Sequence, residues 1–139
     1  MSWLKRVIRA MKPEPGMTVE APSAEYPRPL DAMAAILEHY LGADTDESWV
    51  TFEAQGTERS ATVQVAGRVI NLLLEGHVDL PGILRRNGLD ALAGGCTPSD
   101  DMWILKDAGA SELAMAVHTV FVDHHALGEG YRLRGFIES

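Results

Sequence analysis

The chain has 139 residues, a length that suits one ordinary domain and leaves little room for two. Hydrophobic residues make up 46% of the sequence and charged residues 23%, a globular composition that argues against wholesale disorder. The 20 acidic side chains outnumber the 12 basic ones, and the resulting net charge of −8 disfavours a protein that coats nucleic acid.

The cysteine content and the hydropathy of the chain indicate its compartment. The single cysteine, Cys96, cannot form an internal disulfide bond or a multi-cysteine zinc site. No signal-peptide hydrophobic region precedes a small-residue cleavage site, and no apolar run approaches the roughly 20 residues that span a bilayer. These features predict a cytoplasmic protein.

The first 12 residues form a basic segment whose charge differs from that of the rest of the chain. They carry four basic side chains and no acid, so the remainder carries a charge of −12. Five apolar side chains recur at helical spacing and gather on one stripe: Trp3, Leu4, Val7, Ile8 and Met11. The pattern predicts a cationic amphipathic helix, which either docks weakly on an anionic membrane surface or in a partner's groove, or packs on its own acidic domain.

Residues 13–29 hold five of the seven prolines in the chain. Because proline fixes its own φ and biases the preceding residue toward extended backbone, this stretch is predicted to be a semi-rigid linker. It would separate the basic helix at residues 1–12 from a single domain at residues 30–139.

The first half of that domain reads as one helix and a β-meander. Apolar side chains repeat at helical spacing through residues 30–41, and Gly42 is expected to take the left-handed conformation just after the helix. Three strands joined by short glycine-containing turns follow at residues 48–54, 61–65 and 69–74. Such short turns allow antiparallel hairpins and cannot supply a parallel crossover.

The second half adds two helices and two strands. Asp79 and the proline two residues later start a short helix, and Gly88 is placed to end it. A strand at residues 102–105 precedes a long core helix at residues 110–125, and alternation predicts a last strand at residues 131–137. The order α-β-β-β-α-β-α-β predicts an α+β domain, with an antiparallel sheet of about four to five strands packed against two long helices.

Histidines are the first candidates for chemistry. His118 and His125 lie seven residues apart on the second long helix, with Asp123 between them, so they could share a face. A helical zinc motif needs ligands four residues apart and a distant third ligand, which this spacing does not supply, so a structural role is favoured. A small hydrolase or metal-binding protein that uses His118 and His125 stays open as an alternative.

Other reactive side chains give weaker patterns. Cys96 lies in a glycine-rich loop with no base placed beside it, and the sequence matches no thiol-hydrolase signature. The acidic run at residues 44–47 fails as a calcium loop, because Trp49 stands where glycine is required and Gln55 where glutamate is required. No catalytic residue, metal or cofactor is therefore predicted.

Aromatic and basic side chains on the strands suggest a surface for a partner. Trp49 and Trp103 lie near strand ends, and the last strand places Arg132, Arg134 and Phe136 on one face. Exposed together, such side chains would mark an interface, although the aromatic ones could instead cover the edges of the core. Trp49, Trp103, Arg132 and Arg134 join the stripe of the basic helix as predicted partner-binding residues.

The body of the chain resembles the type III secretion chaperone-like fold and, within it, YbjN-like and TY-Chap proteins. The resemblance rests on the strand at residues 48–52, residues 84–89 with their glycine, Met102 and Trp103 after a loop, and the helix at residues 112–120. It implies a non-enzymatic protein that binds other proteins, often as a homodimer, and holds an extended segment of its partner. The basic helix and the linker lie outside the common core of that family.

Three functions follow as hypotheses. The first is a protein-binding or chaperone-like module whose client is unknown. The second is a membrane-surface or partner adaptor that docks through residues 1–12, and the third is the small enzyme or metal protein built on His118 and His125. A protein partner is expected in the first two, and nucleic acid in none.

Overall fold

The structure is a computed structural model that describes residues 17–72, 78–100 and 102–139. The predicted basic helix, with Trp3, Leu4, Val7, Ile8 and Met11, lies outside the described residues, as does part of the third predicted strand at residues 73–74.

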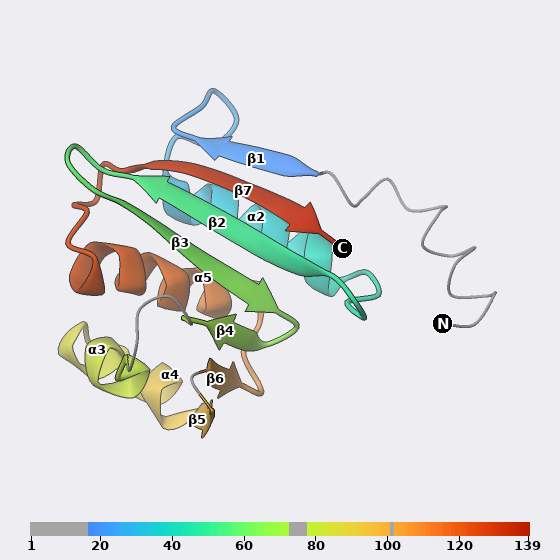
Figure 1. The fold of residues 1–139 in the computed structure, drawn as a ribbon, viewed down its shortest axis with the longest axis vertical. Coiled ribbons are helices and arrows are strands. Elements are labelled where there is room, and N and C mark those ends of the chain that lie inside the picture. The colour runs from blue at the N-terminus through green and yellow to red at the C-terminus, as the bar shows by residue number, and fades with distance from the viewer. Residues whose placement is uncertain (1–16, 73–77, 101) are drawn as a thin grey trace.

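Seven strands of the described residues form one antiparallel sheet in the order β1-β7-β2-β3-β4-β6-β5. Their bounds in chain order are β1 (Thr18–Ala21), β2 (Trp49–Gln55), β3 (Ser60–Ala66), β4 (Val69–Asn71), β5 (Cys96–Ser99), β6 (Met102–Leu105) and β7 (Arg132–Glu138). The last strand, β7, lies between β1 and β2, so the two ends of the described chain meet at one side of the sheet (Figure 1).

Helices cover one face of this sheet, and Figure 1 looks onto the other face. The two long helices, α2 (Pro29–Leu41) and α5 (Ala110–Thr119), contact each other across the covered face. A π-helical turn, η2 (Val120–His124), continues α5, and two short helices, α3 (Leu80–Arg86) and α4 (Asp90–Gly94), lie near the β4-β6-β5 end. The predicted α+β class, with an antiparallel sheet and helices on one face, is confirmed.

Strand alternation builds the core between the two layers. Along β2, Val50, Phe52 and Ala54 are buried beneath the helices, while Glu53 and Gln55 are exposed on the open face. The buried ring of Phe52 lies against Gly135 of β7, where an added Cβ would come 2.9 Å from the ring. Glycine at this position therefore lets Phe52, the largest buried side chain of β2, enter the core.

The predicted strand count and linker were wrong in part. The sheet has seven strands, because β1 and β5 join the five that the sequence indicated. Residues 18–21, expected within the linker at residues 13–29, form β1, and Val19 and Ala21 are buried against the core. Hydrogen bonding to β7 and this burial outweigh the prolines on either side.

The ends of the helices follow the predicted signals with one exception. Pro29 is the first residue of α2, and the Asp79 carboxylate accepts a hydrogen bond of 3.1 Å from the Gly82 backbone N–H at the start of α3. Gly88 has a φ of +76°, which suits a residue that ends α3. Gly42 was expected in the left-handed region, but its φ of −78° keeps right-handed helical backbone.

None of the helices in the described part of the chain is both long enough and apolar enough to cross a membrane.

Candidate functional site: a pocket beside His118

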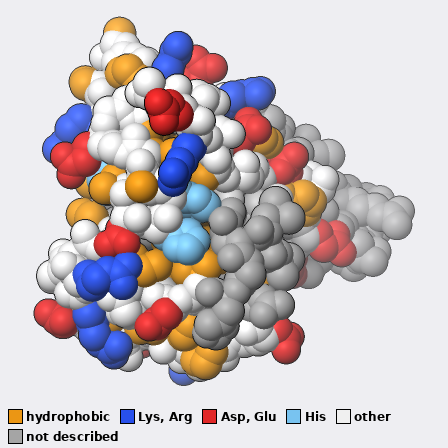
Figure 2. Space-filling view, turned by 60° about the vertical axis from the view of Figure 1, so that its left-hand side comes forward, with side chains coloured by type: hydrophobic (Ala, Val, Ile, Leu, Met, Phe, Trp, Pro, Cys, Tyr) orange, Lys and Arg blue, Asp and Glu red, His pale blue; other side chains and the backbone are white. Residues whose placement is uncertain are grey.

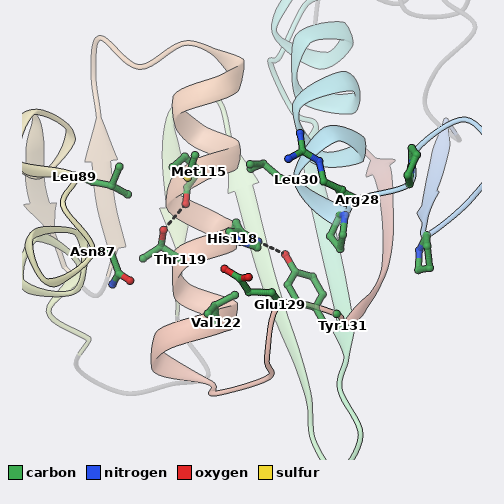
Figure 3. Close-up of a pocket in the computed structure, with 14 residues that line it drawn as sticks. Arg28, Leu30, Asn87, Leu89, Met115, His118, Thr119, Val122, Glu129 and Tyr131 are labelled. Atoms are coloured by element: carbon green, nitrogen blue, oxygen red, sulfur yellow. Dashed lines mark hydrogen bonds between the residues drawn. The ribbon is translucent and has the colours of Figure 1, made fainter.

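A cavity of about 570 Å³ lies on the helical side of the molecule. Four segments line it: residues 22–30, which run from a loop into the first turn of α2; residues 87–89, which follow α3; one face of α5 with η2; and residues 129–131 before β7 (Figure 3). Figure 2 shows histidine side chains exposed among hydrophobic ones on the side of the molecule that is at the left in Figure 1. A volume of this order suits one or two amino-acid side chains or a small molecule.

Most of the wall is apolar. The hydrophobic lining side chains come from three of the four segments: Pro22, Pro27, Pro29, Leu30, Leu89, Met115 and Val122. On α5, Met115 and His118 face the pocket, while Leu113 and Val117 point into the core. The helix therefore has two apolar stripes, one buried and one partly exposed at the pocket.

The side chains of His118 and Tyr131, joined by a hydrogen bond, form one wall of the pocket (Figure 3). The imidazole Nδ1 and the phenol oxygen lie 2.8 Å apart, and the ring centroids lie 5.7 Å apart. When the Tyr131 hydroxyl donates to Nδ1, the other ring nitrogen carries the proton and can donate to a bound group. The pair can thus hold a polar atom of a ligand inside an otherwise apolar cavity.

Burial keeps both members of this pair uncharged near neutral pH. It lowers the pKa of His118 below its usual 6.5, and the nearby carboxylate of Glu129 opposes that shift. Burial also raises the pKa of the Tyr131 hydroxyl. The wall therefore offers hydrogen bonds without a formal charge.

Two charged side chains line the mouth of the pocket. Arg28 makes a two-point ion pair with Asp31, with both N–O distances 2.9 Å, and this pair lowers the pKa of Asp31. Glu129 is exposed and lies beside His118 in Figure 3. The lining residues thus include one cation that is already paired and one carboxylate.

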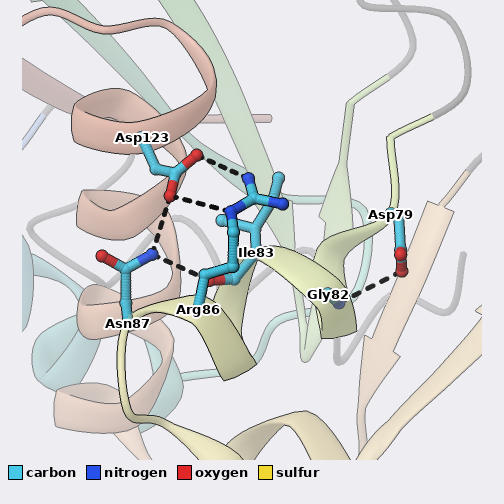
Figure 4. Close-up of polar contacts among 6 residues, drawn as sticks. All are labelled: Asp79, Gly82, Ile83, Arg86, Asn87 and Asp123. Atoms are coloured by element: carbon cyan, nitrogen blue, oxygen red, sulfur yellow. Dashed lines mark hydrogen bonds and ion pairs between the residues drawn. The ribbon is translucent and has the colours of Figure 1, made fainter.

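Hydrogen bonds of Arg86 and Asn87 to Asp123, together called the polar clamp, connect the end of α3 to η2 (Figure 4). Arg86 donates to Asp123 at 2.6 Å, and the Asn87 side-chain amide donates both to Asp123 at 2.9 Å and to the Ile83 carbonyl at 2.8 Å. These donors lower the pKa of the Asp123 carboxyl. Because Asn87 also lines the pocket, the polar clamp fixes the position of the α3 wall.

Three of the strand residues predicted to bind a partner, Trp49, Arg132 and Arg134, lie away from this pocket, on the open face of the sheet. The Trp49 indole donates to Glu138 at 2.9 Å, and Thr51 donates to the same carboxylate oxygen at 2.5 Å. Arg134 lies 3.7 Å from Glu53, with its guanidinium carbon 5.0 Å from the centre of the Phe136 ring. Arg132 is exposed beyond it on β7.

Trp103 does not share that face. It lies opposite Ile70, whose side chain is buried under the helices, and its indole donates to the Val78 carbonyl at 2.9 Å. Trp103 therefore packs against the core beside α3, and the three aromatic residues of the sequence argument do not form one patch.

The structure separates the groups of the metal and thiol hypotheses. His118 forms a hydrogen bond with Tyr131, whereas the His125 ring contacts Phe121 at a tilt and His124 edge-on, and no group of three potential metal ligands occurs among the described residues. The Cys96 thiol donates to the Leu92 carbonyl at 3.6 Å, and burial raises its pKa. A thiol in this state is a weak nucleophile.

Of the pocket, the sequence singled out only His118. The spacing of Met115 and Val122, seven residues apart on the helix, was a signal for a second apolar stripe. Residues 22–29 belong to the stretch at residues 13–29 that was predicted to be a linker, and no local pattern marked Glu129 or Tyr131 as their neighbours.

None of the family models, curated proteins or solved structures compared with the chain matches it.

Proposed function

We propose that the protein is a non-enzymatic, chaperone-like binding module and that the pocket beside His118 holds a side chain of an extended partner segment. The observation that supports this most is the composition of the cavity. Seven hydrophobic side chains of the described residues line it, and the polar atoms of His118 and Tyr131 offer hydrogen bonds. A buried anchor with a few fixed polar contacts is the usual way in which a folded module holds a peptide.

Two further features support a polypeptide ligand. The cavity is open to solvent on part of its surface, so a chain can place one side chain inside while its backbone stays outside. The surrounding prolines restrict backbone motion, which reduces the entropy lost when a ligand orders the rim. The chaperone-like part of the proposal rests on the sequence resemblance at residues 48–52, 84–89 and 112–120.

The test is selection from a phage-displayed library of random peptides on the full chain and on Met115→Trp, which fills the cavity. Met102→Trp is the matched control, because Met102 is also partly buried but lies on the open face of the sheet. We expect the wild type and Met102→Trp to enrich one consensus that Met115→Trp does not retain.

Two results would overturn the proposal: no consensus on the folded wild type, or the same consensus on Met115→Trp. Circular dichroism of each variant confirms that it is folded before selection. Loss of the consensus in Met102→Trp but not in Met115→Trp would place binding on the open face instead.

A further inference from the structure

The charges around the pocket are not balanced. Arg28 is the one cation among the described residues that line it, and Asp31 neutralises Arg28 through two hydrogen bonds of 2.9 Å. Within the same described part of the chain, Glu129 is the one carboxylate that lines the pocket, and no ion pair joins it to a described cation. One negative charge therefore remains at the mouth.

From this arrangement we infer that the pocket selects a lysine or arginine side chain of the partner segment, with the cation at Glu129 and the aliphatic stem in the cavity. The inference rests on the proposed function, because it names the anchor that the peptide supplies. The partner segment that binds here is therefore expected to be basic and not acidic.

The shape of the apolar wall fits such a side chain. Met115 and Val122 lie along one side of the cavity and Leu89 on another, while Glu129 and the His118–Tyr131 pair lie together on the side next to β7 (Figure 3). Lysine and arginine bury three or four methylene groups and keep their charge at a polar surface. An arginine can also make two parallel hydrogen bonds to one carboxylate.

An anionic anchor would find no matching group. Glu129 would repel it, and the charge of Arg28 is already balanced by its ion pair with Asp31. The uncharged His118–Tyr131 pair would supply hydrogen bonds but no countercharge. Between a neutral and a basic anchor side chain, the Glu129 carboxylate favours the basic one, because only a cation gains an attraction to its negative charge.

The field of the whole domain acts in the same direction. Outside the first 12 residues the chain carries a charge of −12. A strongly acidic surface attracts basic segments from a distance and raises their association rate, an effect that falls as salt screens it. Long-range attraction and the local carboxylate therefore select the same class of partner.

The experiment compares peptide selection on the wild type, Glu129→Gln and Glu129→Lys. Glu38→Gln is the matched control, since Glu38 is an exposed glutamate on α2 that does not line the pocket. We expect the wild type and Glu38→Gln to enrich peptides with a basic residue beside apolar ones. Glu129→Gln should bind the selected peptide about fivefold more weakly by calorimetry, and Glu129→Lys should not retain it.

A basic consensus that is equal on the wild type, Glu129→Gln and Glu129→Lys would overturn the inference. A second contradicting result would be a consensus that contains no basic residue and that Met115→Trp does not enrich. This result would contradict the inference but would still support the proposed function. Absence of any consensus on the wild type would overturn both. The three results are therefore distinguishable in one set of selections.

Discussion

The imidazole Nδ1 of His118 and the hydroxyl of Tyr131 lie 2.8 Å apart, which joins α5 to the start of β7 across the wall of the pocket. The same tyrosine ring lies edge-on to Phe121, with centroids 5.5 Å apart, so it is fixed on its apolar side as well. The polar contact that a ligand would meet is thus held by the core and not by the exposed rim.

Removal of the Tyr131 hydroxyl tests how strongly the two residues are coupled. Tyr131→Phe should lower the free energy of unfolding by about 0.5–1.5 kcal/mol, because a half-buried imidazole loses its hydrogen-bond partner. A double-mutant cycle with His118→Leu, measured by urea unfolding, isolates the interaction. Purely additive effects of the two substitutions would contradict a direct bond.

His118 should also make stability depend on pH. Burial lowers its pKa in the folded state below the usual 6.5, so between these values the unfolded chain binds the proton that the folded chain excludes. Stability is therefore full above about pH 6.5 and falls as the pH drops through the folded-state pKa.

Urea unfolding of the wild type and His118→Gln between pH 7.5 and 5.0 checks this dependence. A glutamine side chain can still form a hydrogen bond with Tyr131 but does not titrate. Between pH 7.5 and 5.0, the free energy of unfolding of His118→Gln should therefore fall less than that of the wild type. Parallel curves for the two proteins would show that His118 is not the group responsible. Asp31 and Asp123 do not interfere, because their lowered pKa values act only in more acidic solution.

The contact between Gly135 and Phe52 predicts a large effect from one added methyl group. In Gly135→Ala the new Cβ would lie 2.9 Å from the Phe52 ring and 3.2 Å from Val19, so strands or ring must shift. We expect a loss of about 1–3 kcal/mol in the free energy of unfolding. Gly94→Ala is the control, because nothing lies within 4 Å of its added Cβ, and equal stabilities of the two variants would refute the packing argument.

The clamp at Asp123 predicts unequal roles for its two donors. The Arg86 side chain is 62% exposed, so Arg86→Ala should cost well under 1 kcal/mol. Asn87 bonds both Asp123 and the Ile83 carbonyl, so Asn87→Ala should cost about 1 kcal/mol and loosen the α3 wall. Thermal unfolding measures both variants, and a larger cost for Arg86→Ala would reverse this assignment.

The elements that the sequence predicted well are those whose burial is periodic. The helix at residues 30–41 and the helix at residues 110–125 each carry a clear apolar stripe, and β2, β3 and β7 alternate in and out of the core. The missed strand β1 has only four residues, and β5 contains Pro98, which an edge strand tolerates. Pairing with the distant strand β7 decides the conformation of β1, and no local pattern records it. By contrast, β5 pairs with the next strand, β6, and its four residues show no alternation that marks a strand.

The pocket could be predicted only in fragments. His118 attracted attention as a histidine, but its partner Tyr131 was assigned to a strand face, and Glu129 lies in a loop without a motif. Their proximity to Arg28 depends on how the loop before α2 meets the end of α5, about 90 residues later in the chain. Such proximity follows from the sheet order, in which β7 returns beside β1.

An NMR titration of the ¹⁵N-labelled full chain with a peptide enriched by selection on the wild type locates the bound partner segment. We expect amide shifts that cluster around the pocket, at Leu30, Leu89, Met115, Val122 and Tyr131. Shifts that cluster instead on the open face of the sheet, around Trp49, Gln64 and Phe136, would contradict binding in the pocket.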